Sequence, residues 1–252
     1  MNVSCVAWWR RFGWWVALAM VCLAALPQTG ARQFQNLGFE EVNATNMTPP
    51  VGWAHDLAPG WEWNLNGAGY AADTAVTVNG AIWWTVNSGW VGLMTADNPY
   101  GFPVVGKYGL FLAAGYIGGP SLVPTSMRQT GTIPPGTKSL QFLDYYWAGY
   151  GVPPAAGVEV RINDSLLPLY NSLLSVQPIP LYPHNYTTRT FESYADVSAY
   201  AGQQITLEFS IPSGHLGLDD IQFSPFAVVP EPATWALLGL GFVALLWSRA
   251  RH

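Results

Sequence analysis

Apolar and polar residues alternate along several segments in the second half of the chain. Every second residue of 158–163 is apolar, and the same pattern runs through 205–211. This period of two is typical of antiparallel strands that bury one face. No segment between the two ends of the chain has the apolar period of 3.6 residues that an amphipathic helix would show. The sequence therefore predicts an all-β domain.

Turn-forming residues separate the expected strands. The Pro-Pro-Gly-Thr sequence at 134–137 predicts a turn before a strand at 140–147, and Asn163-Asp164 predicts a hairpin turn. The chain holds 26 glycines and 20 prolines, which suits many short connections. No internal repeat is visible, which disfavours propellers and solenoids. We expect a single antiparallel β-sandwich.

The N-terminus has the pattern of a secretory signal peptide. A basic pair, an apolar stretch and small residues before a cleavage site follow one another: Arg10, Arg11, 12–26, Thr29 and Ala31. Residues 1–31 are therefore predicted to be removed on export. An uncleaved membrane helix is one alternative. A lipoprotein anchored at Cys22 is another, but it would need a small residue in place of Val21.

The C-terminus combines three parts: Pro230-Glu231-Pro232, an apolar run over 233–247, and the basic residues Arg249 and Arg251. At about 1.5 Å per residue the run spans about 22 Å as a helix, less than a hydrocarbon core of about 30 Å. The flanking arginines can reach past the core and keep this end on the cytoplasmic side. We expect a short transmembrane helix here.

These three parts in this order resemble the bacterial PEP-CTERM sorting signal, which would occupy residues 230–252. The resemblance implies an exosortase as a partner, in Gram-negative bacteria that make exopolysaccharide, with cleavage near Pro-Glu-Pro. The precursor would be anchored in the inner membrane, and the product would reach the cell surface or the extracellular matrix. A tail anchor that stays in place is an alternative, as is a GPI signal, although a GPI signal does not normally end in Arg-Ala-Arg-His.

Residues 32–229 would remain after processing, a length that suits one β-sandwich. Both cysteines, Cys5 and Cys22, lie in the signal segment, so this domain has no disulfide. Its 6 lysines and arginines against 14 aspartates and glutamates make it acidic. Such a surface excludes nucleic acid as a partner and suits divalent cations or neutral ligands.

Short motifs along residues 32–229 resemble galactose-binding-like jelly rolls and carbohydrate-binding modules. Residues 36–41 are like the opening strand of these domains, Gly52-Trp53 is like their P-x-G-W segment, and 127–137 are like their middle strand and turn. Residues 196–203 and then 218–221 are similar to the closing strands. The resemblance implies a jelly-roll sandwich, flanked here by the signal peptide and the short transmembrane helix.

Two acids are candidate ligands for a structural calcium ion. Asp219 has the strand parity of Ile221, so we expect it to face the core, where a carboxylate must be paired or bind a metal. The jelly-roll resemblance implies that Glu40 and Asp219 hold Ca²⁺, with Glu41 and Asp220 one register away. The alternative is that Asp219 binds loop amides and Glu40 is solvated. No other cofactor is expected.

Aromatic residues cluster among asparagines and glycines in one stretch: Trp53, Trp61, Trp63, Tyr70, Trp83, Trp84 and Trp90. A sugar-binding site needs an exposed ring for the C–H face of a pyranose and amides for its hydroxyls. Most of these rings should lie in the core. One or two of them are expected to be exposed, and Trp61 and Trp63, which share a parity around Glu62, are favoured. Asn64 and Asn66 would supply the amides of the site.

Catalytic motifs are absent from the sequence. There is no His-Glu-x-x-His, Gly-x-Ser-x-Gly or phosphate-binding glycine loop. Adjacent strand residues point to opposite faces, so His55-Asp56 is interpreted as a loop pair rather than an acid–base couple. Acid pairs for glycoside hydrolysis cannot be recognised from spacing, because the fold sets the separation of the carboxylates.

The sequence thus predicts an exported, non-catalytic envelope protein that binds extracellular polysaccharide or another carbohydrate, or that belongs to the matrix. One alternative is a hydrolase acting on that polysaccharide, which would need two acids in one cleft. The other is a purely structural or adhesive surface protein, which an exposed apolar patch would favour.

Overall fold

The structure is a computed structural model of the chain. It describes residues 32–42, 51–53, 58–65, 75–78, 90–97, 104–116, 122–148, 157–181 and 184–228. All of these except Arg32 belong to one of the two units of the chain, Gln33–His252. The predicted signal peptide and the predicted C-terminal helix lie outside the described residues. Within the described residues, no helix has the length and hydrophobicity needed to cross a membrane.

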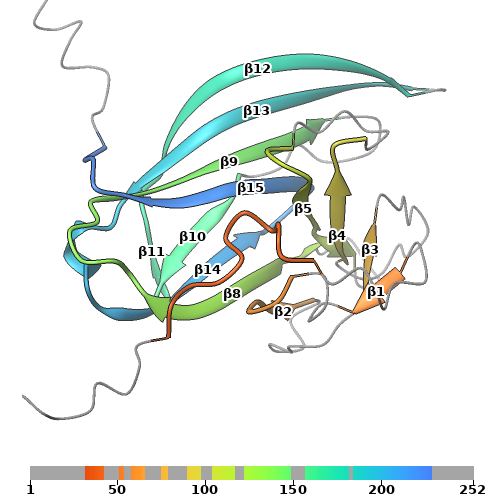
Figure 1. The fold of residues 1–252 in the computed structure, drawn as a ribbon. Coiled ribbons are helices and arrows are strands. Elements are labelled where there is room, and N and C mark those ends of the chain that lie inside the picture. The colour runs from red at the N-terminus through yellow and green to blue at the C-terminus, as the bar shows by residue number, and fades with distance from the viewer. Residues whose placement is uncertain are drawn as a thin grey trace, which may run out of the picture. The chain divides into compact units, whose positions relative to one another are not determined.

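The larger of two main sheets has eight strands in the order β1-β3-β4-β5-β15-β9-β13-β12 (Figure 1). In that order their bounds are Val51–Trp53, Ala75–Val78, Trp90–Thr95, Tyr108–Ala113, His215–Ser224, Ser139–Ala148, His184–Asp196 and Tyr170–Leu181. Strands β3 and β4 are parallel, whereas the other neighbouring pairs are antiparallel. The expected antiparallel pairing is therefore wrong at β3 and β4 and confirmed for the other pairs of this sheet.

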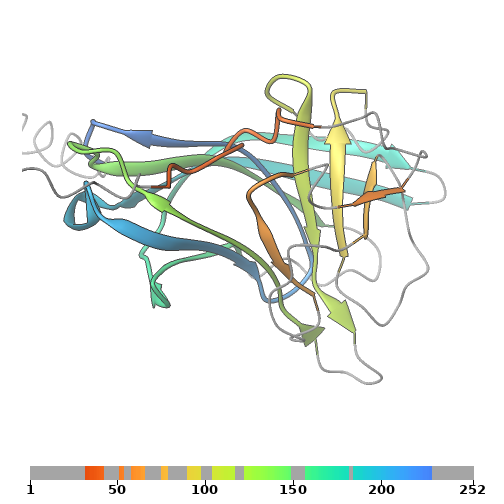
Figure 2. The same ribbon diagram turned by 60° about the horizontal axis from the view of Figure 1, so that its bottom comes forward.

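The smaller sheet has five strands in the order β11-β10-β14-β8-β2. Their bounds in that order are Ser165–Leu166, Glu159–Ile162, Gln204–Ile211, Thr125–Thr132 and Glu62–Asn64. Strands β6 (Gly115–Tyr116) and β7 (Leu122–Val123) form a separate pair. The helical structure of the described residues is limited to one 3₁₀ turn, Ser198–Tyr200. Figure 2 shows the two main sheets as two layers, which confirms an all-β sandwich.

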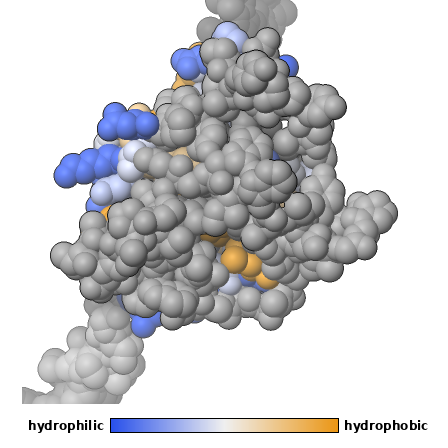
Figure 3. Space-filling model, turned by 90° about the vertical axis from the view of Figure 1, so that its right-hand side faces the viewer, coloured by the Kyte–Doolittle hydropathy of each residue, from blue (hydrophilic) through white to orange (hydrophobic). Residues whose placement is uncertain are grey.

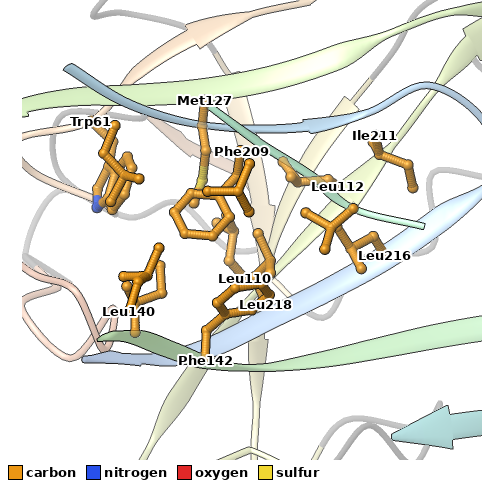
Figure 4. Packing of buried hydrophobic residues seen from close by; sticks show 14 of the residues in the cluster. Trp61, Leu110, Leu112, Met127, Leu140, Phe142, Phe209, Ile211, Leu216 and Leu218 are labelled. Atoms are coloured by element: carbon orange, nitrogen blue, oxygen red, sulfur yellow. The ribbon is translucent and has the colours of Figure 1, made fainter. Parts of the chain in front are cut away.

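The core lies between the two sheets and contains the residues that the alternating pattern predicts. Val160 and Ile162 of β10 and the odd-numbered residues 205–211 of β14 are buried. Buried side chains of β9 and β15 in the larger sheet, such as Phe142 and Leu218, lie on the opposite side of this core from Phe209 of β14 (Figure 4). The rings of Phe142 and Phe209 pack edge to face across the interface, with centroids 5.2 Å apart. The hydrophobic burial that stabilises the sandwich is thus set by period-two patterning.

The predicted turns are present. The amide of Thr137 donates to the carbonyl of Pro134 at 3.2 Å, and Gly136 between them has φ +82°. Asn163 and Asp164 have φ values of +48° and +65°, as a type I′ hairpin turn requires at both central positions. Local turn chemistry therefore sets the register of the β10–β11 hairpin and the connection from β8 in the smaller sheet to β9 in the larger sheet.

The expected opening strand at 36–41 is not a strand. Asn36 and Phe39 have φ values of +48° and +57°, and the amide of Phe39 donates to the carbonyl of Asn36 at 3.2 Å. Two left-handed residues cannot continue an extended backbone, so this segment turns back on itself.

On the side of the molecule shown in Figure 3, described hydrophilic side chains project at one edge and a small apolar area is visible.

Candidate functional site

Trp61 and Trp63, the predicted sugar-binding rings, lie in the core. They are 2 % and 1 % exposed. Trp61 packs against Phe39 and Phe209 with ring centroids 5.9 and 6.2 Å away, and its Nε1 donates to a backbone carbonyl. The predicted exposure is wrong because the shared parity points both rings inward and leaves Glu62 on the solvent side. Buried rings offer no face to a sugar.

The other predicted members of this site are not assembled around the two rings. Asn64 ends β2 opposite Ser126 of β8 and is half-buried. Asn66 lies outside the described residues, as do Tyr70, Trp83, Trp84, His55 and Asp56. Trp53 and Trp90 belong to β1 and β4, but the structure does not describe their side chains.

Asp219 is fully buried, as predicted, but on the other face of its strand. Leu216 and Leu218 point toward the smaller sheet, which we call the inner face, so Asp219 points to the outer face. A β-bulge then interrupts β15, with Asp220 at φ +50°. The bulge turns Ile221 back to the inner face, so the parity argument that placed Asp219 toward the core is wrong.

Asp219 and Glu40, the predicted calcium pair, hold the same loop. Oδ2 of Asp219 accepts the amide of Val105 at 2.7 Å. Oε1 of Glu40 accepts the amides of Lys107 and Tyr108 at 2.8 and 3.1 Å. The two carboxylates therefore satisfy backbone donors in residues 104–108, and we call this arrangement the carboxylate clamp. It matches the amide-bound alternative for Asp219, but Glu40 is amide-bound as well.

The described residues of the clamp do not make up a calcium shell. Three of its four carboxylate oxygens accept backbone N–H groups, including that of Asp220 at 2.7 Å on Oδ1 of Asp219. No group of three or more acids, histidines or cysteines is brought together in the part of the chain that is described. Ca²⁺ takes 6–8 oxygen ligands. Calcium binding at Glu40 and Asp219 stays a prediction.

Burial raises the pKa of Asp219 to about 7. The amides of Val105 and Asp220 oppose this rise, whereas the negative charges of Asp220 and Glu40 add to it. A bound divalent cation would act in the opposite direction and lower this pKa.

A second buried acid, Asp144, lies on the neighbouring strand β9. It is directly opposite Leu218 of β15 and shares the inner face with it. Burial raises the pKa of Asp144 to about 6, against the effect of the Ser193 hydroxyl, which donates to Oδ1 at 2.5 Å. Because Asp144 and Asp219 point to opposite faces of one sheet, they do not share a cleft.

Four polar side chains form a row across the outer face of the larger sheet. Tyr170 of β12, Tyr194 of β13, Gln141 of β9 and Gln222 of β15 are directly opposite one another in register. With strands about 4.8 Å apart, this tyrosine–glutamine row spans about 14 Å. Tyr170 is 45 % exposed and Gln222 is exposed, while the two central side chains are half-buried.

The tyrosine–glutamine row is oriented by hydrogen bonds on the sheet. Nε2 of Gln141 donates to Oγ of Ser139 at 3.2 Å, and Nε2 of Gln222 donates to a carboxylate oxygen of Asp220 at 2.5 Å. Burial and a hydrogen bond to Glu192 raise the pKa of Tyr194 to about 12. Tyr194 therefore keeps a neutral ring at physiological pH, next to the uncharged amides of Gln141 and Gln222.

Sequence reasoning missed this row because its members come from four strands. Each is an ordinary residue in its own segment, and only the register of β12, β13, β9 and β15 brings them together. The signal that could have found them is the alternation of each strand combined with the register of the β12–β13 hairpin.

Comparisons with known proteins identify the C-terminal tail but give little information about the β-sandwich. The PEP-CTERM protein-sorting motif matches residues 228–250, which include Pro230, Glu231, Pro232 and Arg249, while Arg251 lies one residue beyond. This tail implies an exported protein that an exosortase processes and sorts to the envelope. No curated protein matches the chain.

One solved structure is similar, the enzymatically active domain of tailspike protein 4 of bacteriophage CBA120. It is 12 % identical with a TM-score of 0.34, over 77 % of this chain and 21 % of that one. The chain thus spans about a fifth of that protein. A similarity this weak carries no conclusion about the activity of the chain.

Proposed function

We propose that the chain is an exported, non-catalytic envelope protein whose β-sandwich binds extracellular polysaccharide through the tyrosine–glutamine row. The row itself is the observation that carries this proposal. It takes the place of the site predicted at Trp61 and Trp63, whose rings are buried.

The chemistry of the row suits a neutral sugar. An aromatic ring packs against the apolar C–H face of a pyranose, and amide groups both donate to and accept from its hydroxyls. Two adjacent tyrosines followed by two glutamines provide both kinds of contact in a line, as a chain polymer requires. The acidic balance of residues 32–229 would repel an anionic polymer, so a neutral polysaccharide fits better.

The PEP-CTERM tail supports the same class of ligand, an extracellular polysaccharide. Such tails imply export in bacteria that make exopolysaccharide, so the sandwich would meet polysaccharide where the protein is delivered. The jelly-roll carbohydrate-binding modules that the sequence resembles are the type of domain that we assign to residues 32–229.

The positions of the buried acids favour binding over hydrolysis. A glycoside hydrolase needs two carboxyl groups on either side of one glycosidic bond. The two acids with pKa values raised to about 6 and about 7, Asp144 and Asp219, point to opposite faces of the sheet and are fully buried. Both oxygens of Asp219 also accept backbone amides.

Binding of the exported protein to an array of neutral polysaccharides tests the proposal. Tyr170→Ala and Gln222→Ala should each weaken binding about tenfold, which corresponds to about 1.4 kcal/mol. Phe226→Ala is the matched control, because Phe226 is a 75 % exposed ring that lies off the row. Equal binding by all variants, or no binding by the wild type, would contradict the proposal.

Adding Ca²⁺ or a chelator to the same array tests the calcium prediction separately. If Glu40 and Asp219 hold Ca²⁺, the chelator should lower the melting temperature of the wild type but not that of Asp219→Asn. A wild-type melting temperature that the chelator leaves unchanged would contradict the calcium prediction. It would leave the proposal for the tyrosine–glutamine row unaffected.

A further inference from the structure

The four edges of the two sheets differ greatly in length. Among the described residues, the edge strands β1, β11 and β2 have 3, 2 and 3 residues, whereas β12 has 12. An edge strand leaves N–H and C=O groups unpaired along one side, and proteins commonly protect themselves by keeping edges short. Strand β12 is the edge where this protection is missing.

Charge does not protect β12 either. Residues 165–183 contain no aspartate, glutamate, lysine or arginine. Lysines and other charges on edge strands are the usual means of preventing contact with another strand. Pro178 and Pro180 interrupt the donor pattern in the second half of the strand. The part of β12 that can accept a new strand is therefore 170–177.

Apolar side chains gather on this same segment. Of the seven exposed large hydrophobic residues in the described part of the chain, four lie on β12. Leu173, Leu174 and Val176 are 54 %, 52 % and 52 % exposed. A β-bulge between Leu173 and Ser175 shifts the register of β12 by one residue. Leu173 and Val176 therefore both have the parity of the inner face, on the opposite side of the strand from Tyr170 of the tyrosine–glutamine row.

A second copy of the chain is the occupant that best fits this edge. Two acidic copies repel each other over most of their surfaces, and a segment without charge is where that repulsion is weakest. Antiparallel pairing of one strand with itself obeys a twofold axis, so each copy offers the other the same leucines, valine and backbone groups.

We propose that residues 170–177 of β12 pair antiparallel with the same strand of a second copy, which joins two larger sheets into one. The dimer buries Leu173, Leu174 and Val176 of both copies. The tyrosine–glutamine rows of the two copies then lie on the same face of a continuous sheet. This pairing does not depend on what the row binds.

Sedimentation velocity tests the dimer. The sample is the protein as it is recovered after expression of the full chain and export, purified in detergent. The double variant Leu173→Lys/Val176→Lys places charges on the edge, and we expect it to sediment as a monomer while the wild type sediments as a dimer. Phe226→Lys is the matched control, an exposed apolar residue off the edge, and should remain a dimer. A far-UV circular dichroism spectrum of the edge variant equal to that of the wild type shows that the fold is retained.

Disulfide trapping provides a second measurement. In a chain with Cys5→Ser and Cys22→Ser, a single Leu173→Cys substitution near the twofold axis should form a covalent dimer on mild oxidation. Phe226→Cys in the same background should not. A monomeric wild type, a dimer that the edge lysines leave intact, or equal trapping of both cysteines would overturn the proposal. So would a wild type that sediments only with a different protein.

Discussion

Two buried aspartates lie on neighbouring strands of the larger sheet and differ in almost every other respect. Asp219 of β15 faces outward, and both of its oxygens accept backbone amides. Asp144 of β9 faces inward, where the hydroxyls of Ser193 and Tyr146 stabilise its charged form but no backbone amide of the described residues reaches Oδ2. Asp219 therefore has a structural role in the carboxylate clamp, where it holds the loop at 104–108. Asp144 lies inside the core and has fewer hydrogen-bond donors than its two oxygens can accept.

The same contrast between faces holds for residues adjacent along β9. Phe142 points inward and is fully buried against Phe209, while Gln141 points outward into the tyrosine–glutamine row. Inner residues of this sheet should therefore control stability, and outer residues near the row should control binding.

The largest effect is expected from the inner face. Phe142→Ala should lower the free energy of unfolding by about 3–5 kcal/mol, because it removes a fully buried ring and leaves a cavity. Urea unfolding followed by tryptophan fluorescence measures this loss. Gln141→Ala, one residue away, should change stability by less than about 0.5 kcal/mol and weaken sugar binding instead. A large loss of stability in both variants would show that the two faces are not distinct.

The second prediction concerns the pH dependence that Asp144 causes. Because its pKa is raised from 3.8 to about 6, the folded chain holds this proton more tightly than the unfolded chain. Stability is therefore lost as the pH rises from about 4 to about 6, and the loss remains above that range. Asp144→Asn lacks this loss and keeps the acceptor for Ser193. It should exceed the wild type by up to about 3 kcal/mol at pH 8 and by little at pH 4.

Unfolding curves of both proteins from pH 4 to pH 8 measure this difference. His215 titrates with the opposite sign, since burial lowers its pKa to about 4 and its contribution to stability grows as the pH rises toward 6.5. It is present in both proteins, so the difference between them isolates Asp144. An Asp144→Asn variant that is less stable than the wild type at pH 8 would mean that the carboxylate is fully satisfied when ionised.

Asp219→Asn should behave differently from Asp144→Asn. The comparison is made at pH 5, below the folded pKa of about 7. The substitution replaces one of the two oxygens that accept a backbone N–H by an NH₂ group, so two donors then face each other. We expect a loss of about 1–3 kcal/mol, the cost of an unsatisfied buried donor. Hydrogen exchange of the Val105 amide should accelerate in the same variant. If Asp219→Asn is as stable as the wild type at pH 5, Asp219 does not stabilise the loop through the carboxylate clamp.

The sequence predicts those parts of this molecule that depend on local pattern. Alternation at 158–163 and 205–211 gives β10 and β14, and the turns at Gly136 and Asn163-Asp164 follow from residues that tolerate positive φ. The two sheets, the all-β class and the sorting tail follow from the same kind of local signal.

The candidate site depends on information that is not local. Parity alone does not say which side of β2 is buried, so the sequence predicts Trp61 and Trp63 on the wrong side. A one-residue bulge at Asp220 puts Asp219 and Ile221 on opposite faces, and an aspartate that tolerates positive φ does not by itself distinguish a bulge inside a strand from a turn. The tyrosine–glutamine row needs the register of four strands, which long-range pairing decides.

The smallest expected effect separates the ring of Tyr194 from its hydroxyl. Tyr194→Phe removes the hydrogen bond to Glu192 and keeps the aromatic face, so stability should fall by about 1 kcal/mol or less. If the ring is the sugar contact, affinity for the polysaccharide should change less than about threefold, whereas Tyr194→Ala should lose about tenfold. Equilibrium binding to one array-positive polysaccharide distinguishes these outcomes. Equal losses in both variants would transfer the recognition from the ring to the hydroxyl and Glu192, and the outer face would then act through a hydrogen-bonded carboxylate instead of a neutral ring.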